Sequence, residues 1–173
     1  LSDTMVFKDD PDHLRLRGLV NKAFTPKMVG RMEDDVRGVV DRLIGDLAGR
    51  DGTVDLVGAF AVPLPLSVIA QMLGVGPEDR DAFHGMMMRL VDALPSPIQM
   101  IRSLPTGNRM VRLFERMADE RRAAPDGRLV SALIEANDDG DRLSDAEVIS
   151  MIFLLLLAGH DTTANLLGSG ILA

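Results

Sequence analysis

Apolar positions along most of this chain recur every three or four residues, the spacing that places them on one face of an α-helix. The clearest run follows Thr25 and continues to about Arg50; its members are Val29, Met32, Val36, Val39, Val40, Leu43, Ile44 and Leu47. Segments with the two-residue alternation of a half-buried strand are scarce. The pattern therefore predicts a mainly α fold with about eight helices.

Capping signals place the boundaries of these helices. Asp10–Pro11 and Thr25–Pro26 each combine an N-cap residue with a proline at the first helical position. The helices are expected over residues 11–22, 26–50, 66–73, 77–94, 106–124 and 129–136, with a short helical piece after Asp55. We expect Pro63 and Pro65 to interrupt the chain, a loop-rich passage through Pro95, Pro97 and Pro105, and a turn over residues 138–141.

Ser144-Asp145-Ala146-Glu147 has the pattern of a capping box, in which the serine and the glutamate each bind the other's backbone N–H. It is expected to begin the longest helix, which continues to the last residue. Met151 to Ala158 is an apolar run of eight residues, far short of the roughly 20 that span a bilayer. We interpret it as a buried helix of a soluble protein, without a membrane segment.

In this last helix, polar residues follow directly after the apolar run. At 100° per residue, Ala158, Asp161, Thr162 and Asn165 share one face, together with Leu154 and Leu155 a turn earlier, while His160 and Thr163 point elsewhere. A buried carboxylate needs a partner, and a mid-helix threonine can bond to the carbonyl one turn earlier. Gly159 would let a flat group approach the backbone. Spacing alone supports equally a groove that holds a small molecule and passes protons, and a wetted surface face.

The first helix carries a basic pair, His13 and Arg17, four residues apart. Leu16, Val20 and Phe24 share their face, and Arg15 falls on the opposite side. An inward Arg–His pair could hold a carboxylate or a phosphate with charge-assisted hydrogen bonds. For an isolated pair, side chains that extend along the edge of the core are the more frequent case.

Composition narrows the class of protein. The 173 residues include 46% apolar and 26% charged residues, which is typical of one soluble globular domain. The formal net charge of −7 argues against a nucleic-acid partner, which requires a basic surface. The sequence contains no cysteine, which excludes disulfides, Cys-ligated zinc, iron–sulfur clusters and any thiolate-ligated cofactor held by this chain alone.

Three stretches together resemble the cytochrome P-450 monooxygenases. Ala158-Gly159-His160-Asp161-Thr162-Thr163 is similar to the oxygen-groove motif of that family's long central helix. Residues 12–20, followed by Ala23-Phe24-Thr25-Pro26, resemble the propionate-binding helix of the soluble bacterial members. Residues 55–80 look like the stretch that precedes the substrate-roof helices. The resemblance covers nearly the whole chain, with the motifs in the expected order.

The resemblance implies a fold and a set of roles. The fold would be the multi-helix P-450 array, from the propionate-binding helix through the central oxygen-groove helix. His13 and Arg17 would bind a haem propionate, and Ala158 and Gly159 would lie against the haem face. Thr162 would deliver protons during dioxygen activation, with Asp161 as the relay to solvent. Met86, Met87 and Met88, with Leu90 and Leu94, would lie in the substrate roof, although ordinary core packing explains them equally well.

The resemblance also implies a cofactor and partners. The cofactor would be haem (iron protoporphyrin IX), with electrons from NAD(P)H through a ferredoxin and ferredoxin reductase-type donor. One atom of O2 would enter a small apolar organic substrate, and the protein would be cytoplasmic. The thiolate ligand of the haem and the family's Glu-x-x-Arg helix are missing from this sequence. We therefore expect residues 1–173 to be a partial P-450 domain, inactive alone, whose N- and C-terminal parts are absent and whose axial cysteine lies beyond Ala173.

Two other classes stay open from the residues alone. The first is an all-helical interaction or regulatory domain without a cofactor, which would leave the polar face of the last helix unexplained. The second is a metal-dependent phosphohydrolase of the His-Asp type, built on His160 and Asp161. His13 and His84 are the only other histidines, and adjacent helical residues diverge by 100°, so such a site would need ligands from elsewhere.

Overall fold

The computed structural model of the protein describes residues 4–93, 95–138 and 140–172. Over these residues the chain forms seven α-helices: α1 (Asp12–Ala23), α2 (Pro26–Ala48), α3 (Pro63–Leu73), α4 (Arg80–Ala93), α5 (Pro97–Ala123), α6 (Leu129–Glu135) and α7 (Asp145–Leu172). Two 3₁₀-helices (Met5–Phe7 and Pro77–Asp79), a π-helix (Val57–Ala61) and a hairpin of β1 (Asn137–Asp138) and β2 (Asp141–Arg142) complete the fold. The prediction of a mainly α fold is confirmed.

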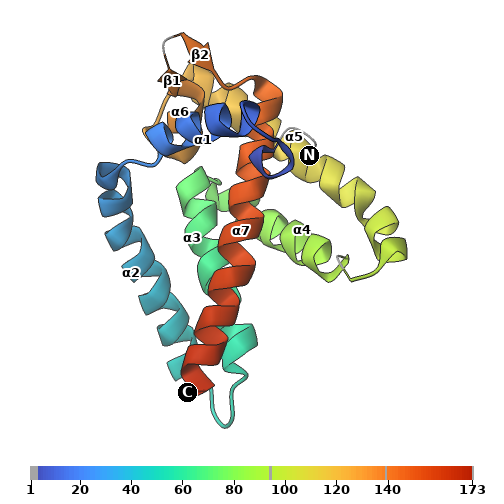
Figure 1. Ribbon diagram of the computed structural model, residues 1–173. Coiled ribbons are helices and arrows are strands. Elements are labelled where there is room, and N and C mark those ends of the chain that lie inside the picture. The colour runs from blue at the N-terminus through green and yellow to red at the C-terminus, as the bar shows by residue number, and fades with distance from the viewer. Residues whose placement is uncertain (1–3, 94, 139, 173) are drawn as a thin grey trace.

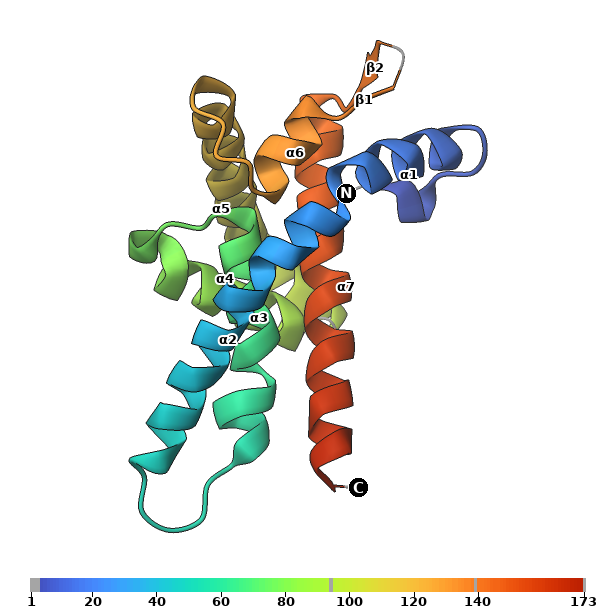
Figure 2. The same ribbon diagram turned by 90° about the vertical axis from the view of Figure 1, so that its left-hand side faces the viewer.

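Helix α7 is the axis of the molecule. It packs on α3, the π-helix, α5 and α6. Figure 1 shows α2 on one flank of α7 and α4 with α5 on the other, while α1, α6 and the hairpin lie across its N-terminal end. In Figure 2 the C-terminal half of α7 extends away from that end. The two helices with the predicted site residues, α1 and α7, therefore meet at one end of the molecule.

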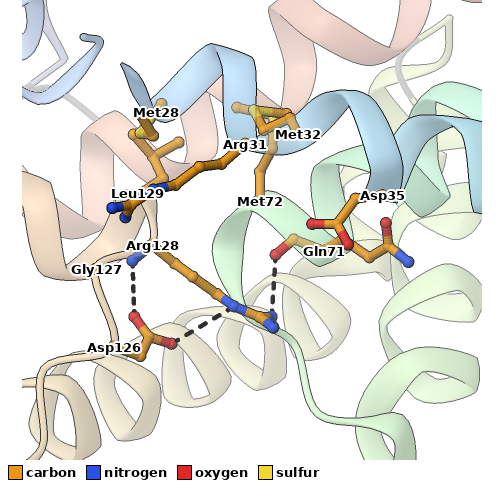
Figure 3. Close-up of a pocket in the computed structure, with 10 residues that line it drawn as sticks. All are labelled: Met28, Arg31, Met32, Asp35, Gln71, Met72, Asp126, Gly127, Arg128 and Leu129. Atoms are coloured by element: carbon orange, nitrogen blue, oxygen red, sulfur yellow. Dashed lines mark hydrogen bonds and ion pairs between the residues drawn. The ribbon is translucent and has the colours of Figure 1, made fainter. Parts of the chain in front are cut away.

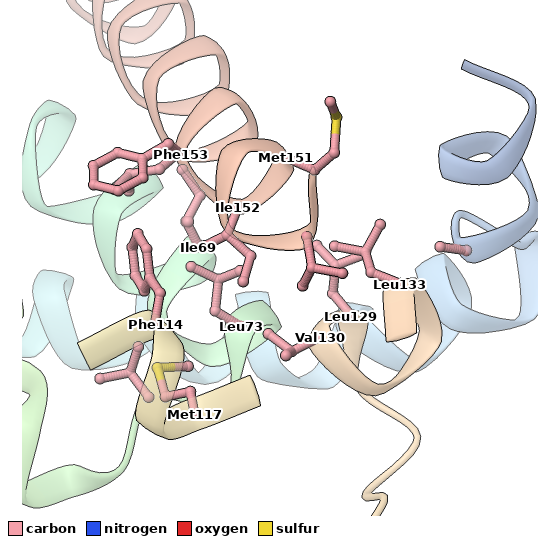
Figure 4. Close-up of a cluster of buried hydrophobic side chains, with 14 of the residues drawn as sticks. Ile69, Leu73, Phe114, Met117, Leu129, Val130, Leu133, Met151, Ile152 and Phe153 are labelled. Carbon is pink, nitrogen blue, oxygen red and sulfur yellow. The ribbon is translucent and has the colours of Figure 1, made fainter. Parts of the chain in front are cut away.

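The main core surrounds the first half of α7 (Figure 4). Helices α1 and α4 also contribute to it; the buried side chains from α3, α5, α6 and α7 include Ile69, Leu73, Phe114, Met117, Leu129, Val130, Leu133, Met151, Ile152 and Phe153. Phe114 and Phe153 make an edge-to-face contact with ring centroids 4.9 Å apart, a geometry that aromatic pairs prefer. Burial of these side chains fixes the N-terminal half of α7 in the protein interior.

Two of the predicted helix starts are confirmed at the level of hydrogen bonds. The Thr25 side chain accepts a bond from the Met28 backbone N–H at 3.2 Å and caps α2, with Pro26 at its first position. At the start of α7, Ser144 N–H donates to Glu147 Oε2 at 2.7 Å and Glu147 N–H donates to Ser144 Oγ at 3.3 Å. These reciprocal bonds form the predicted capping box.

The proline-rich passage differs from the prediction. Helix α5 begins at Pro97, where the Ser96 side chain accepts a bond from Gln99 N–H at 3.5 Å, and it continues through Pro105. Pro105 cannot donate to the carbonyl four residues earlier, that of Ile101. This part of the helix is exposed, with Ile101 at 68%, so solvent can bind the freed carbonyl. The loop expected through Pro105 was therefore wrong.

Two smaller expectations also differ. Pro63 and Pro65 lie in the first turn of α3, where a missing N–H costs nothing, rather than interrupting the helix. Asp10 makes no capping bond to α1, whose cap residue is Pro11. Asp138 and Asp141, the ends of the expected turn, pair in the β1–β2 hairpin, and residue 139 lies outside the described residues. Helix α4 ends at Ala93, and the expected end at Leu94 lies outside the described residues.

Helix α7 is the one helix, among the described residues, that is long and apolar enough to cross a membrane by length and composition, with a mean hydropathy of 1.3. Core helices of soluble proteins pass the same test. Met151, Ile152 and Leu156 are buried at 0% exposure inside the protein, which supports the interpretation of this run as a core helix.

Candidate functional site

The structure contains the polar face predicted on α7, and this face is exposed to solvent; we call it the open face of α7. Ala158, Asp161, Thr162 and Asn165 are all exposed, whereas His160 is buried on the opposite side. Leu154 and Leu155 are half-buried one turn earlier, and Leu157 is 38% exposed. Beyond Leu156 the helix therefore keeps one buried side, at His160 and Ala164, and presents on its other side a face of leucines, a carboxylate and a hydroxyl.

Thr162 makes the back-bond that its mid-helix position predicts. Its Oγ1 donates to the carbonyl oxygen of Ala158 at 2.6 Å. This bond competes with the helical hydrogen bond to the same carbonyl, and it fixes the hydroxyl beside Asp161 on the open face. A hydroxyl held next to a carboxylate can accept a proton from one side and donate one to the other.

Gly159 faces a different neighbour from the one expected. A Cβ atom at this position would meet Cδ1 of Ile69, on α3, at 3.1 Å. The close approach that the missing side chain permits is therefore that of α3 to α7, rather than that of a flat group on the open face. Ala158 does lie on the open face, and binding of a cofactor by Ala158 and Gly159 stays a prediction.

His160, next to Asp161 in sequence, is a buried polar residue of α7 at 3% exposure. Its Nδ1 atom has no hydrogen-bond partner among the described residues. Burial lowers the pKa of the imidazole below its ordinary value, and the Asp161 carboxylate offsets part of that decrease. His160 is therefore a neutral packing residue at neutral pH, which the spacing argument placed away from the open face without assigning it a role.

The basic pair on α1 is less inward than predicted. Leu16 and Val20 are buried, as expected, but Arg17 is exposed. Its guanidinium has no partner in the part of the chain that the structure describes. His13 is half-buried, and its Nδ1 lies 3.6 Å from Oδ1 of Asp10. The pair thus offers one unpaired cation and one imidazole to a ligand at the surface of α1.

Arg15 has contacts that the sequence did not indicate. Its Nη1 donates to both carboxylate oxygens of Asp141, at 3.2 and 3.3 Å, and its Nη2 pairs with Glu147. Burial lowers the pKa of this guanidinium, but the charges and hydrogen bonds of Glu147 and Asp141 outweigh that effect and raise it overall. No local signal reveals these contacts, because both partners lie more than 120 residues away in sequence.

The structure has a separate cavity of about 200 Å³ between α2, the end of α3 and the loop before α6 (Figure 3). Met28, Met32 and Met72 line it together with Arg31 and Arg128. Arg128 Nη1 donates to the backbone oxygen of Gln71 at 3.3 Å. None of the predicted site residues contributes to this cavity, so it is distinct from the open face of α7.

The methionines expected in the substrate roof lie in two environments. Met87 is buried in the core at 1% exposure, while Met86 and Met88 are partly buried against it. Core packing therefore accounts for Met87. Within residues 4–93, 95–138 and 140–172, no group of three or more His, Asp or Glu side chains is arranged to hold a metal ion, so the ligands that a His-Asp phosphohydrolase needs are not gathered there.

Comparison with known proteins decides between the remaining interpretations. No protein-family model matches the chain. The chain is 42% identical over 173 residues to cytochrome P-450 107B1 of Saccharopolyspora erythraea, and 41% identical over 170 residues to vitamin D(3) 25-hydroxylase of Pseudonocardia autotrophica. These alignments cover 100% and 98% of this chain, and 42% and 41% of the two relatives.

Solved structures give the same result. The P-450 MycG superposes with a TM-score of 0.89 at 30% identity, covering 96% of this chain and 42% of that one. CYP109E1 of Bacillus megaterium, in complex with testosterone, superposes with a TM-score of 0.86 at 30% identity, covering 93% of this chain and 43% of that one. The chain belongs to the cytochrome P-450 family. It spans about two fifths of the length of the P-450 relatives that it matches.

The residues of this P-450 chain fit the haem that its family binds. The unpaired guanidinium of Arg17 and the imidazole of His13 are donors suited to propionate carboxylates. The exposed face of α7 offers the small side chain of Ala158 and the apolar side chain of Leu157 to a flat, mainly apolar group. The chain contains no cysteine, so it does not itself supply the axial thiolate.

Proposed function

We propose that this chain is the dioxygen-activating and propionate-binding part of a haem-dependent P-450 monooxygenase. The observation that carries the proposal is the hydrogen bond from Thr162 Oγ1 to the Ala158 carbonyl, beside Asp161 on an exposed face of a helix whose first half lies in the core. The back-bond orients the Thr162 hydroxyl on the open face, where it can take part in proton delivery. The pairwise alignments with P-450 relatives, over 98–100% of the chain, support membership of the same family.

Bound haem would supply the reductive cleavage of dioxygen, which consumes two electrons and two protons, inserts one oxygen atom into the substrate and releases the other as water. The residues of this chain would bind, orient and deliver protons. Arg17 and His13 would hold the propionates. The Thr162 hydroxyl would donate protons toward the reacting oxygen, and the exposed carboxylate of Asp161 would take them from solvent.

The remaining parts of the reaction are proposed on the same basis. The substrate would be a small apolar organic molecule, and the electrons would come from NAD(P)H through a ferredoxin and ferredoxin reductase-type donor in the cytoplasm. The axial cysteine would lie beyond Ala173 in a longer protein. The 173-residue chain would then be inactive by itself, because thiolate ligation drives oxygen–oxygen bond cleavage.

The absorption spectrum of the reduced, carbon monoxide-bound protein tests the proposal. The complete protein should give the red-shifted band characteristic of thiolate-ligated haem. The 173-residue chain, expressed alone and mixed with haem, is the matched control and should not give this band, because it contains no thiolate. A complete protein without the band would overturn the proposed function.

A further inference from the structure

Ion pairs join one face of α1 to the β1–β2 hairpin and to the start of α7. Arg15 and Lys22, seven residues apart, lie on the same side of the helix. Arg15 binds both carboxylate oxygens of Asp141, at 3.2 and 3.3 Å, and pairs with Glu147. Lys22 Nζ donates to Asp138 Oδ1 at 2.6 Å. Both cations of this face therefore reach the β1–β2 hairpin, and Arg15 alone also reaches α7.

The carboxylate of Glu147 joins this contact rigidly to α7. One of its oxygens, Oε2, accepts the capping bond from Ser144 N–H at 2.7 Å, and the other, Oε1, pairs with Arg15. Its side chain is only 17% exposed, so solvent screens the pair less than it screens a surface ion pair. The first turn of α7 and the middle of α1 are thus held through a single carboxylate.

The rest of the interface of α1 is apolar. Leu16, Leu19 and Val20 are buried against the core, and apolar burial is non-directional. It sets which side of α1 faces the core but allows small rotations of α1 about its own axis. The fork of a guanidinium does fix an orientation, because its N–H groups bind carboxylates in set directions.

His13 and Arg17 are two residues before and two residues after Arg15, on the side of α1 that faces away from the ion pairs. Any rotation of α1 moves these two side chains relative to α7. We propose that Arg15 and Glu147 are positioning residues that hold His13 and Arg17 at a fixed angle to the open face of α7. The inference rests on the proposed function, since it is the haem propionates that His13 and Arg17 would bind.

The test measures haem retention in the complete haem-bound protein, as the rate of transfer of haem to an excess of apomyoglobin. Arg15→Ala should raise this rate about tenfold, as expected when a residue that orients a ligand-binding group is removed. It should also change the spin-state balance of the ferric haem spectrum. Arg15→Lys, which keeps the charge but not the fork, should restore retention only in part.

Glu147→Gln keeps an oxygen for the capping bond to Ser144 N–H and removes the charge that pairs with Arg15. It should raise the rate of haem transfer by itself but add little in an Arg15→Ala background, because both changes break one contact. Fully additive effects would show that the two residues act separately and would overturn the inference.

Arg122→Ala is the matched control. Arg122 is 35% exposed, against 33% for Arg15, and its Nη2 donates to Asp145 Oδ1 in the first turn of the same helix α7, at 2.5 Å. It reaches α7 from α5 and does not involve α1. Its removal should leave the rate of haem transfer and the ferric spectrum unchanged within about twofold.

The outcomes separate this inference from the proposed function. A wild-type protein that binds haem, with an Arg15→Ala variant that retains haem equally well, overturns the inference alone. Equal haem loss from Arg15→Ala and Arg122→Ala does the same, because it reports a general loss of stability. A wild-type protein that binds no haem overturns the proposed function and this inference with it.

Discussion

Thr162 and Thr163 are adjacent residues of one type with different surroundings. Thr162 is exposed on the open face and donates to the Ala158 carbonyl at 2.6 Å, whereas Thr163 is half-buried on another side of α7. A proton-delivery role belongs to the side chain that is both positioned and accessible. The neighbouring threonine therefore offers an internal control for the function of the first.

Thr162→Ala in the complete enzyme should uncouple the reaction. NAD(P)H consumption should continue while the yield of oxygenated product per NAD(P)H falls roughly tenfold or more, because the hydroxyl that donates the proton is gone. The missing product should appear as hydrogen peroxide, and Thr162→Ser should recover most of the yield. Product and peroxide are measured in the same reaction. Thr163→Ala should leave both unchanged, and unchanged coupling in Thr162→Ala would remove Thr162 from this role.

The burial of His160 predicts how the free energy of unfolding depends on pH. Burial lowers the pKa of its imidazole in the folded protein. Burial also lowers the pKa of His84; the charge of Asp81 opposes this shift, and the charges of Arg42 and His160 lower the pKa further. Below the unfolded pKa of about 6.5 the unfolded chain binds more protons than the folded one. The stabilisation by the neutral imidazoles is therefore complete above that pH and decreases as the pH falls below it.

The free energy of unfolding, measured with urea, should fall between pH 7 and pH 5 in the wild type. His160→Gln should make this decrease smaller, and His84→Gln combined with His160→Gln should reduce it further. Thr163→Ala, at a half-buried position of the same helix that carries no titratable group, is the control and should leave the slope unchanged. An identical slope in wild type and His160→Gln would contradict the assignment of a buried, neutral His160.

At the scale of elements, local chemistry predicted the helices that begin with their own signals. Thr25–Pro26 and Ser144–Glu147 form their caps with residues three positions away, so a short window of sequence contains the whole interaction. The prediction at Pro105 was wrong because the cost of a proline within a helix, about 3 kcal/mol, is offset here by packing elsewhere in the helix. Met110, Phe114 and Met117 of α5 are buried, and their packing stabilises the helix on the C-terminal side of Pro105.

The candidate site, like the helices, was predictable where local helical geometry determines it. The shared face of Ala158, Asp161 and Thr162 follows from helical geometry, and the structure places them together. The open side of that face and the exposure of Arg17 depend on which elements pack where, so spacing left them undecided or wrong. The contacts of Arg15 were not predictable, because they join positions 126 and 132 residues apart.

At the scale of the whole molecule, α7 has two halves with different environments. Val148, Met151, Ile152 and Leu156 are buried in the core, whereas Leu157, Leu166 and Ile171 are 38%, 72% and 48% exposed. Figure 2 shows the second half extending away from the end where α1 and α6 lie. A helix is stabilised chiefly by packing of its apolar face rather than by its own hydrogen bonds. The two halves should therefore differ in stability.

Amide hydrogen exchange of the 173-residue chain should reveal that difference. Amides of residues 148–156 should exchange about tenfold or more slowly than those of residues 161–171, because local opening follows the number of buried apolar contacts. Helix α5 is the control within the same chain, since its burial runs the other way, with Ile98 and Leu104 exposed and Met110 and Phe114 buried. Its first half should exchange faster than its second. If both halves of α7 exchange at one rate while α5 shows its gradient, packing in this chain does not set the stability of α7, and the open face that would receive the haem is ordered by other means.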